Sequence, residues 1–320
     1  MAEIIDSDDI DFSFYENETD AQQKVKTAAV YIQELIDRIH TPVAPVHVLM
    51  PWRKTHNFVQ FRPGEVTIWG GMSGAGKSLV TGQIALSLCA QGEKTCIASF
   101  EMKPLKTLER MGRQFSGENP GDPTWLHIPD SRAALISLYE EFKDWTDNRL
   151  WLYDQQGTVT VKQVCAVIRY CVKEKNVTQF FVDSLMKCVA GEDDLNGQKA
   201  FIDEICAIAR DHNIHVHVIH HVRKPKDDKA KPGKYDYKGS GAITDQVDNV
   251  ITVWRNKEKE RKLESGEQVD QNKDPDAILI CDKQRNGEWE GSIALWFHAI
   301  SQQFVANYND EPLKLYSPDA

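Results

Sequence analysis

The chain has 320 residues, of which 41% are hydrophobic, and its formal net charge is −10. This length suffices for one large α/β domain with extensions, and the negative charge argues against a protein that coats nucleic acid over its whole surface. Because no apolar run approaches the ~18 residues of a membrane span, we expect no membrane partner. The seven cysteines form no C-x-x-C pair, as expected for core residues of a cytoplasmic protein.

The first predicted segments precede the main domain. Residues 1–20 are acidic and lack Lys and Arg, so we expect a disordered N-terminus rather than a targeting peptide. Residues 21–40 place apolar side chains at helical spacing, and Pro42 and Pro45 end this amphipathic pattern. We therefore expect a linker helix in 21–45, the main domain in 46–306 and a C-terminal tail in 307–320.

Within the main domain, strand and helix patterns alternate. Strands are expected at 66–69, 94–100, 150–153, 179–182 and 214–220, with helices at 79–90, 105–115, 161–175 and 198–211. After a lysine-rich loop come strands at 250–254, 277–281, 292–297 and 304–306, without helices between them. This order predicts an α/β fold with a mostly parallel sheet, helices on both faces and hairpins at one edge. The most irregular segments are 116–130, 188–197, 223–243 and 257–275.

A glycine-rich loop stands between the first of these strands and the first helix. It fits G-x-x-x-x-G-K-[ST], and its strand–loop–helix context favours a phosphate loop over an ordinary glycine-rich turn. Backbone N–H groups and the helix N-terminus would bind the phosphates of ATP or another nucleoside triphosphate. Lys77 is expected to reach the β- and γ-phosphates and Ser78 to bind Mg²⁺. The predicted nucleotide-binding residues are Gly71, Ser73, Gly74, Ala75, Gly76, Lys77, Ser78 and Leu79.

Two acidic residues follow apolar strand patterns. Asp183 ends the run 179–182, as in a Walker B motif, and is expected to hold Mg²⁺ through water. Glu101 follows the strand 94–100. Because ligands bind at the carboxyl ends of parallel strands, Glu101 is expected to face the γ-phosphate and orient the attacking water. The alternative for Glu101 is a solvated charge at the start of the helix near Pro104.

Five short motifs then follow in the order expected of hexameric replicative helicases: Ser99–Met102, Val182–Leu185, His221–Pro225, Lys238–Ala242 and Lys283–Gly287. Over residues 50–306 the chain resembles the DnaB C-terminal domain, the helicase half of phage primase-helicases, and mitochondrial Twinkle. The resemblance implies a RecA-like core and a homohexameric ring that binds ATP between adjacent subunits.

The resemblance also implies individual roles. Glu101 would be the catalytic base and His221 the sensor of the γ-phosphate. Lys283 and Arg285 would reach the ATP of the neighbouring subunit as a pair of fingers, so that hydrolysis requires assembly. The helix in residues 21–40 would pack on the adjacent subunit, and the alternative is that it covers the sheet of its own chain.

Basic residues are concentrated in the loop 223–238. A lone charge run is typical of a solvated surface. This one follows His221, however, where RecA-like rings project loops into the central channel, and a second such loop is expected at 186–197. Together they would bind a single-stranded DNA backbone without sequence preference. The predicted DNA-binding residues are Lys187, Arg223, Lys224, Lys226, Lys229 and Lys231.

Alternatives remain at this point. The histidines at 212, 215, 217, 220 and 221 permit a metal cluster, although no carboxylate or cysteine pattern completes it. Besides a ring helicase that moves on single-stranded DNA, a RecA-like or clock-type ATPase and a small-molecule kinase share the phosphate loop. The kinase hypothesis lacks an arginine-rich lid. We expect a separate primase or loader, since no primase domain is recognised, and a bacterial or phage-infected cytoplasm, with the short length favouring a phage.

Overall fold

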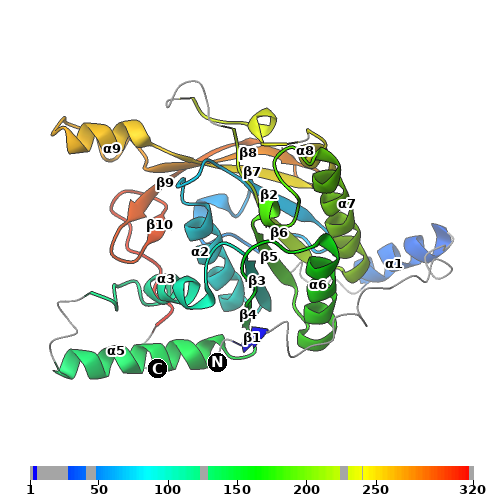
Figure 1. The fold of residues 1–320 in the computed structure, drawn as a ribbon, viewed down its shortest axis with the longest axis horizontal. Coiled ribbons are helices and arrows are strands. Elements are labelled where there is room, and N and C mark those ends of the chain that lie inside the picture. The colour runs from blue at the N-terminus through cyan, green and yellow to red at the C-terminus, as the bar shows by residue number, and fades with distance from the viewer. Residues whose placement is uncertain are drawn as a thin grey trace.

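The computed structural model describes residues 3–5, 28–40, 48–122, 129–223, 230–239 and 241–316. Its centre is a ten-stranded sheet in the order β1-β4-β3-β5-β6-β2-β7-β8-β9-β10 (Figure 1). The strands are β1 (Glu3–Ile5), β2 (Val66–Gly70), β3 (Thr95–Ser99), β4 (Leu150–Tyr153), β5 (Gln179–Asp183), β6 (His215–Ile219), β7 (Asn249–Arg255), β8 (Ala277–Gln284), β9 (Gly291–His298) and β10 (Gln303–Val305).

Neighbouring strands from β1 to β7 are parallel, and β7 to β10 continue the sheet as antiparallel hairpins. Such a parallel sheet is buried on both faces, which explains why its strands are continuous apolar runs. In β5, for example, the adjacent Phe180 and Phe181 belong to two separate core clusters. The predicted mostly parallel sheet with hairpins at one edge is confirmed.

Helices cover both faces of this sheet (Figure 1). On one face α6 and α7 bury residues such as Val164 and Ile205, and on the other α2 and α3 bury Ile84 and Phe115. The helices are α1 (Ala28–His40), α2 (Lys77–Ala90), α3 (Pro104–Ser116), α5 (Pro129–Thr146), α6 (Val161–Lys175), α7 (Leu195–His212), α8 (Ala242–Gln246) and α9 (Lys257–Glu264). Short 3-10 turns lie at Arg53–Thr55, Leu185–Lys187 and Lys234–Asp236.

The expectation that no helix interrupts the late strands is wrong, because α9 lies between β7 and β8. Its charged sequence shows no apolar stripe, but Lys, Glu and Arg have good intrinsic helix propensity. The side chain of Asn256 caps its first turn by accepting from the N–H of Lys259 at 3.0 Å. The buried Lys259 then reaches Asp276, with 2.7 Å between Nζ and Oδ1, and this pair fastens the helix to the sheet.

Two further departures concern segments without a predicted element. Residues 3–5, inside the segment expected to be disordered, form β1 beside β4. Helix α5 was not predicted, and it packs Phe142 against Phe115 of α3, with ring centroids 4.9 Å apart. Both elements are fixed by partners distant in sequence. Of the predicted helix in residues 21–40, the part 28–40 forms α1, while 21–27 lie outside the described residues.

Candidate nucleotide-binding and catalytic site

The phosphate loop connects the end of β2 to the start of α2. Gly74 and Gly76 have φ angles of 75° and 90°, a left-handed conformation that favours glycine. A Cβ at Gly71 would lie 2.7 Å from the carbonyl oxygen of Val253, so the backbone of β7 also requires glycine there. The first N–H groups of α2 have no partner within the helix and carry the positive end of its dipole. The loop therefore forms a cradle for an anion.

Lys77 lies inside this cradle. Its side chain is buried, and Nζ donates to the carbonyl oxygens of Gly71 at 2.8 Å and Met72 at 3.0 Å. The Nδ1 atom of His221 is 3.3 Å from the same nitrogen. Burial lowers the pKa of Lys77 to about 8, although the carboxylates of Asp183 and Glu101 act in the opposite direction. A bound triphosphate would restore the charge on this ammonium.

Ser78 and Asp183, the residues predicted to bind Mg²⁺, lie in contact. The hydroxyl of Ser78 donates to Oδ2 of Asp183 at 2.8 Å, and burial raises the pKa of this carboxyl. A hydroxyl beside a carboxylate is the hard oxygen donor set that suits Mg²⁺. In the described residues no group of three or more His, Cys, Asp or Glu side chains could hold a metal ion. The donors therefore fit an ion that completes its shell with water and phosphate oxygens.

Glu101 is the second residue after β3 and lies at the same site. Its Oε1 accepts from the hydroxyl of Ser184 at 2.8 Å and lies 3.8 Å from Nε2 of His221. The imidazole of His221, and after it the Ser184 hydroxyl, lower the pKa of Glu101 to about 2. The side chain is 42% exposed, so it is ionised and reachable by water. Such a carboxylate orients a water molecule as a hydrogen-bond acceptor.

These groups surround one hollow of about 280 Å³. The fold thus brings together Lys77 from α2, Asp183 from β5, and Glu101 and His221 from the ends of β3 and β6. The neighbouring strands end at the same edge of the sheet, which is where ligands bind in parallel α/β folds. The residues lining the hollow are Ser73, Gly74, Ala75, Gly76, Lys77, Ser78, Leu79, Glu101, Arg110, Asp183, His221 and Gln302. Arg110 and Gln302 were not predicted.

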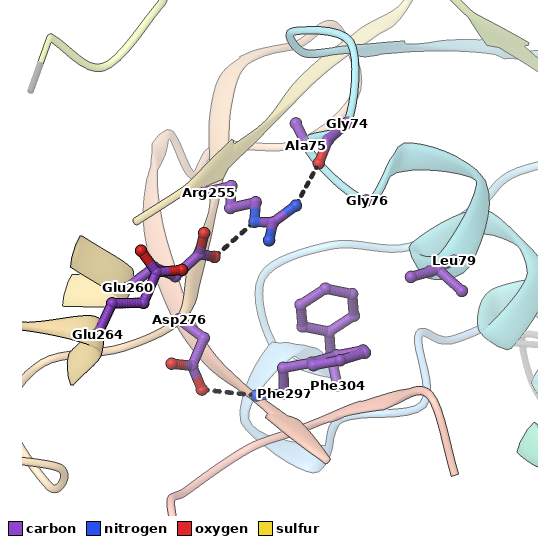
Figure 2. A pocket seen from close by; sticks show the side chains of 10 residues that line it. All are labelled: Gly74, Ala75, Gly76, Leu79, Arg255, Glu260, Glu264, Asp276, Phe297 and Phe304. Atoms are coloured by element: carbon purple, nitrogen blue, oxygen red, sulfur yellow. Dashed lines mark hydrogen bonds and ion pairs between the residues drawn. The ribbon is translucent and has the colours of Figure 1, made fainter. Parts of the chain in front are cut away.

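A second hollow of about 350 Å³ adjoins the loop on the side of α9, and sequence reasoning missed it. Figure 2 shows the rings of Phe297 and Phe304 facing Arg255 across it. Arg255 donates to the carbonyl oxygen of Gly74 at 3.0 Å and pairs with Glu260 at 2.5 Å. One signal was present: β7 is the parallel neighbour of β2, so the residue ending β7 lies beside the phosphate loop.

Lys283 and Arg285 do not line either hollow. Nζ of Lys283 donates to the carbonyl oxygens of Thr244 at 3.0 Å and Val247 at 2.8 Å, near the end of α8. Arg285 pairs with Asp248, with 3.1 Å between Nη1 and Oδ1. Asp248 precedes β7, so both basic residues lie at the amino ends of the parallel strands. The five residues of β2, roughly 17 Å of strand, separate this end from the phosphate loop.

Lys224, Lys226 and Lys229 of the predicted DNA-binding residues lie outside the described residues. Lys187 belongs to the 3-10 turn after β5. Lys231 is near the ring of Trp254, with Nζ 5.4 Å from the centroid.

The two loops expected to bind DNA contact each other. Lys238, from the loop that contains Arg223, pairs with Glu192 of the other loop, with 2.5 Å between Nζ and Oε1. Gly239 lies directly against the side-chain amide of Gln198, at the start of α7. The loops therefore form one continuous surface.

The histidines of β6 are core residues. His215 bonds to the carbonyl oxygen of Arg62 at 2.7 Å and to the hydroxyl of Thr67 at 2.8 Å. His217 stacks on Phe181, with ring centroids 4.1 Å apart. Burial lowers the pKa of His215 to about 4, so its ring is neutral. These contacts account for the rings without a metal.

No helix in the part of the chain that the structure describes is long and apolar enough to cross a membrane. Solved structures with this fold include an ATPase domain that matches at 14% identity and a TM-score of 0.71. That match covers 88% of this chain and 99% of the other. A DnaB-like replicative helicase, described with its interactions with primase, matches at 14% identity and a TM-score of 0.67, over 88% of this chain and 67% of the other.

The family comparison agrees with the motifs and the fold. The model of the DnaB-like helicase C-terminal domain matches residues 56–306, which is more than half of the chain. This confirms both the resemblance seen in the sequence and the RecA-like fold class. The chain belongs to the DnaB-like helicase C-terminal domain family and is an ATP-dependent replicative DNA helicase.

Proposed function

We propose that this helicase works as a homohexameric ring that hydrolyses ATP between neighbouring subunits and moves along single-stranded DNA. The observation that carries the proposal is the division of the site. Glu101, Lys77 and His221 gather at the carboxyl ends of the strands, whereas Arg285 lies at the amino ends. Because one chain holds the two halves at opposite ends of its sheet, Arg285 reaches a phosphate loop only in another subunit.

In this arrangement the triphosphate of ATP lies on the phosphate loop. Its adenine ring enters the hollow beside Phe297 and Arg255. Mg²⁺, held by Ser78 and through water by Asp183, would neutralise charge on the phosphate oxygens. The ionised Glu101 orients the attacking water. His221 lies between Lys77 and Glu101 and contacts both, so it detects the presence of the γ-phosphate. Arg285, with Lys283, stabilises the charge of the transition state from the next subunit.

The DNA-binding surface that we propose combines Lys187 with the basic loop that begins at Arg223. Support comes from the pair between Lys238 and Glu192, which joins the two loops. The basic loop starts two residues after His221, so the same short segment touches the nucleotide site and the DNA surface. An overall charge of −10 is compatible with DNA binding if the basic residues line a channel.

Helix α1 is the element that we propose to join the subunits. It stands away from the sheet in Figure 1. Three of its apolar side chains are exposed: Ile32 at 55%, Leu35 at 58% and Ile39 at 78%. An amphipathic helix needs apolar surface to bury against, and the described part of its own chain leaves Ile32, Leu35 and Ile39 uncovered. This arrangement favours packing on a neighbour over the alternative in which α1 covers its own sheet.

A separate primase or loader is part of the proposal, as is a cytoplasmic location. The location is supported by the cysteines, all of which are buried and free rather than paired in disulfides. A DnaB-like helicase that matches this fold has been described with primase, and we infer a similar partner here.

The test is a pair of assays on the purified chain: ATP turnover with and without single-stranded DNA, and displacement of one strand from a forked duplex. We expect DNA to stimulate turnover and ATP to be required for displacement, with Lys77→Ala as the inactive control. Turnover without any strand displacement would favour the alternative, a RecA-like or clock-type ATPase that binds partners without unwinding DNA.

A further inference from the structure

Tyr235 is the most exposed large hydrophobic side chain in the described residues, at 86%. It lies in the 3-10 turn Lys234–Asp236, within the basic loop that runs from β6 to α8. A single exposed apolar side chain is ordinary on a protein surface. The turn that holds Tyr235, however, is fixed on both sides by hydrogen bonds and by a buried neighbour.

The first restraint is the backbone around Asp236. Its carboxylate accepts from the N–H of Gly233 at 2.8 Å, and its own N–H donates to the carbonyl oxygen of Gly233 at 3.0 Å. The N–H of Arg223, at the other side of the loop, donates to the carbonyl oxygen of Asp236 at 2.6 Å. These bonds hold Tyr235 at the tip of a closed turn.

The second restraint is Tyr237, which is buried two residues away. Its hydroxyl lies 3.2 Å from the carbonyl oxygen of Ile251 and 3.1 Å from the hydroxyl of Thr252. Its ring lies against Gly70, where a Cβ would be 2.2 Å from the ring atoms. Gly70 ends β2, directly before the phosphate loop. The turn that presents Tyr235 therefore rests on the nucleotide site.

The surroundings of the exposed ring are basic. Nζ of Lys234 lies 5.5 Å from the centroid of the Tyr235 ring, and Arg223 and Lys231 belong to the same loop. Of the carboxylates near the turn, Asp236 is bonded to the N–H of Gly233 and Glu192 to Lys238, and Asp282 interacts with Lys234. A flat ring beside positive charge matches a nucleotide, which has an aromatic face and an anionic phosphate.

We propose that Tyr235 is a stacking platform for a base of the single-stranded DNA. The inference rests on the proposed function and adds that the loop recognises the bases as well as the phosphates. Stacking of this kind is tolerant of sequence, because every base has an aromatic face. It also gives the nucleotide site a direct route to the bound strand, through Tyr237 and through the N–H of Lys238, which donates to the carbonyl oxygen of His221 at 3.0 Å.

The experiment compares binding of the whole protein, with a slowly hydrolysed ATP analogue, to oligothymidylate and to a strand of equal length made of abasic units. The variants are Tyr235→Ala and Tyr235→Phe, with Tyr308→Ala as a matched control, since Tyr308 is 45% exposed but lies outside the loop. We expect Tyr235→Ala to weaken oligothymidylate binding about five- to a hundredfold while leaving abasic binding unchanged. Tyr235→Phe and Tyr308→Ala should bind both strands like the wild type.

Unaltered melting temperatures would show that the variants fold. Equal loss on the two strands, or no loss on either, would overturn the inference while leaving the proposed function intact. A defect in ring formation with normal DNA affinity would also overturn it, because Tyr235 would then contact a neighbouring subunit. Failure of the wild type to bind oligothymidylate would instead contradict the proposed function itself.

Discussion

At the residue scale, we propose that hydrolysis depends on Glu101, which contacts His221 and Ser184. Its depressed pKa, about 2, keeps the carboxylate charged at neutral pH. Replacing it by an amide keeps the size but removes the charge that orients the water.

We expect Glu101→Gln to bind ATP and single-stranded DNA as the wild type does while ATP turnover falls by at least ~10²-fold. The measurement is steady-state phosphate release beside binding of a fluorescent ATP analogue. The control is Glu118→Gln, an exposed glutamate that lies outside the catalytic hollow, which should retain full turnover. A Glu101→Gln protein with wild-type turnover would show that Glu101 does not orient the attacking water.

We expect Lys77 to make ATP binding dependent on pH. Burial lowers its pKa to about 8, so the free protein loses the ammonium proton as the pH rises through that value. Because the triphosphate needs the charged form, ATP affinity should be constant below pH 7 and about tenfold weaker at pH 9. Titration with a fluorescent analogue across this range measures the effect. Constant affinity up to pH 9 would show that the ammonium keeps its proton despite burial.

At the element scale, the loops after β5 and β6 carry the proposed DNA surface. We expect Lys224, Lys226 and Lys231, changed together to Ala, to weaken single-strand binding about equally for all sequences. The slope of log K against log salt should become shallower by about 2, since each lost phosphate contact contributes ~0.7. A charge-matched control changes the exposed Lys106, Lys143 and Lys273 instead. An unchanged slope would show that the basic loop is a solvated surface that does not bind DNA.

Helix α1 can be tested without removing β1. We expect Ile32, Leu35 and Ile39 changed to Ser to leave a folded, ATP-binding monomer, because each buried Leu or Ile contributes about 1.5–3 kcal/mol to an interface. Sedimentation velocity with nucleotide measures the assembly, and Gln33→Ser on the same helix is the control. Intact hexamers would show that α1 does not join the subunits. An unfolded variant would support the alternative that α1 packs on its own chain.

The elements also show what the sequence can and cannot predict. The phosphate loop, Glu101 and Asp183 were predictable because each follows an apolar strand, and parallel strands end at one edge. The second hollow, beside Arg255, could not be predicted. Its residues Phe297 and Phe304 come from hairpin strands, and the packing of these strands against the phosphate loop depends on contacts distant in sequence. Helix α9 was not predicted because it has no apolar stripe. It is stabilised instead by the cap at Asn256 and by the ion pair of Lys259.

At the scale of the whole molecule, the proposed hydrolysis depends on assembly of the subunits. One chain places its hollow with Glu101 and its Arg285 at opposite ends of the sheet, and we therefore propose that a monomer cannot complete the site. Lys77→Ala protein retains Arg285 but lacks a working phosphate loop. Arg285→Ala protein retains the loop but lacks the finger, and it should bind ATP normally while DNA-stimulated turnover falls by ~10³-fold or more.

Mixing these two inactive variants tests the central claim most directly. In mixed rings, the intact phosphate loop of an Arg285→Ala subunit can face the arginine of a Lys77→Ala neighbour. The account predicts that DNA-stimulated ATP turnover returns in part, with a maximum at intermediate ratios of the two proteins. No recovery at any ratio, with mixed rings demonstrated by differently labelled subunits, would contradict it and show that Arg285 does not act across a subunit interface.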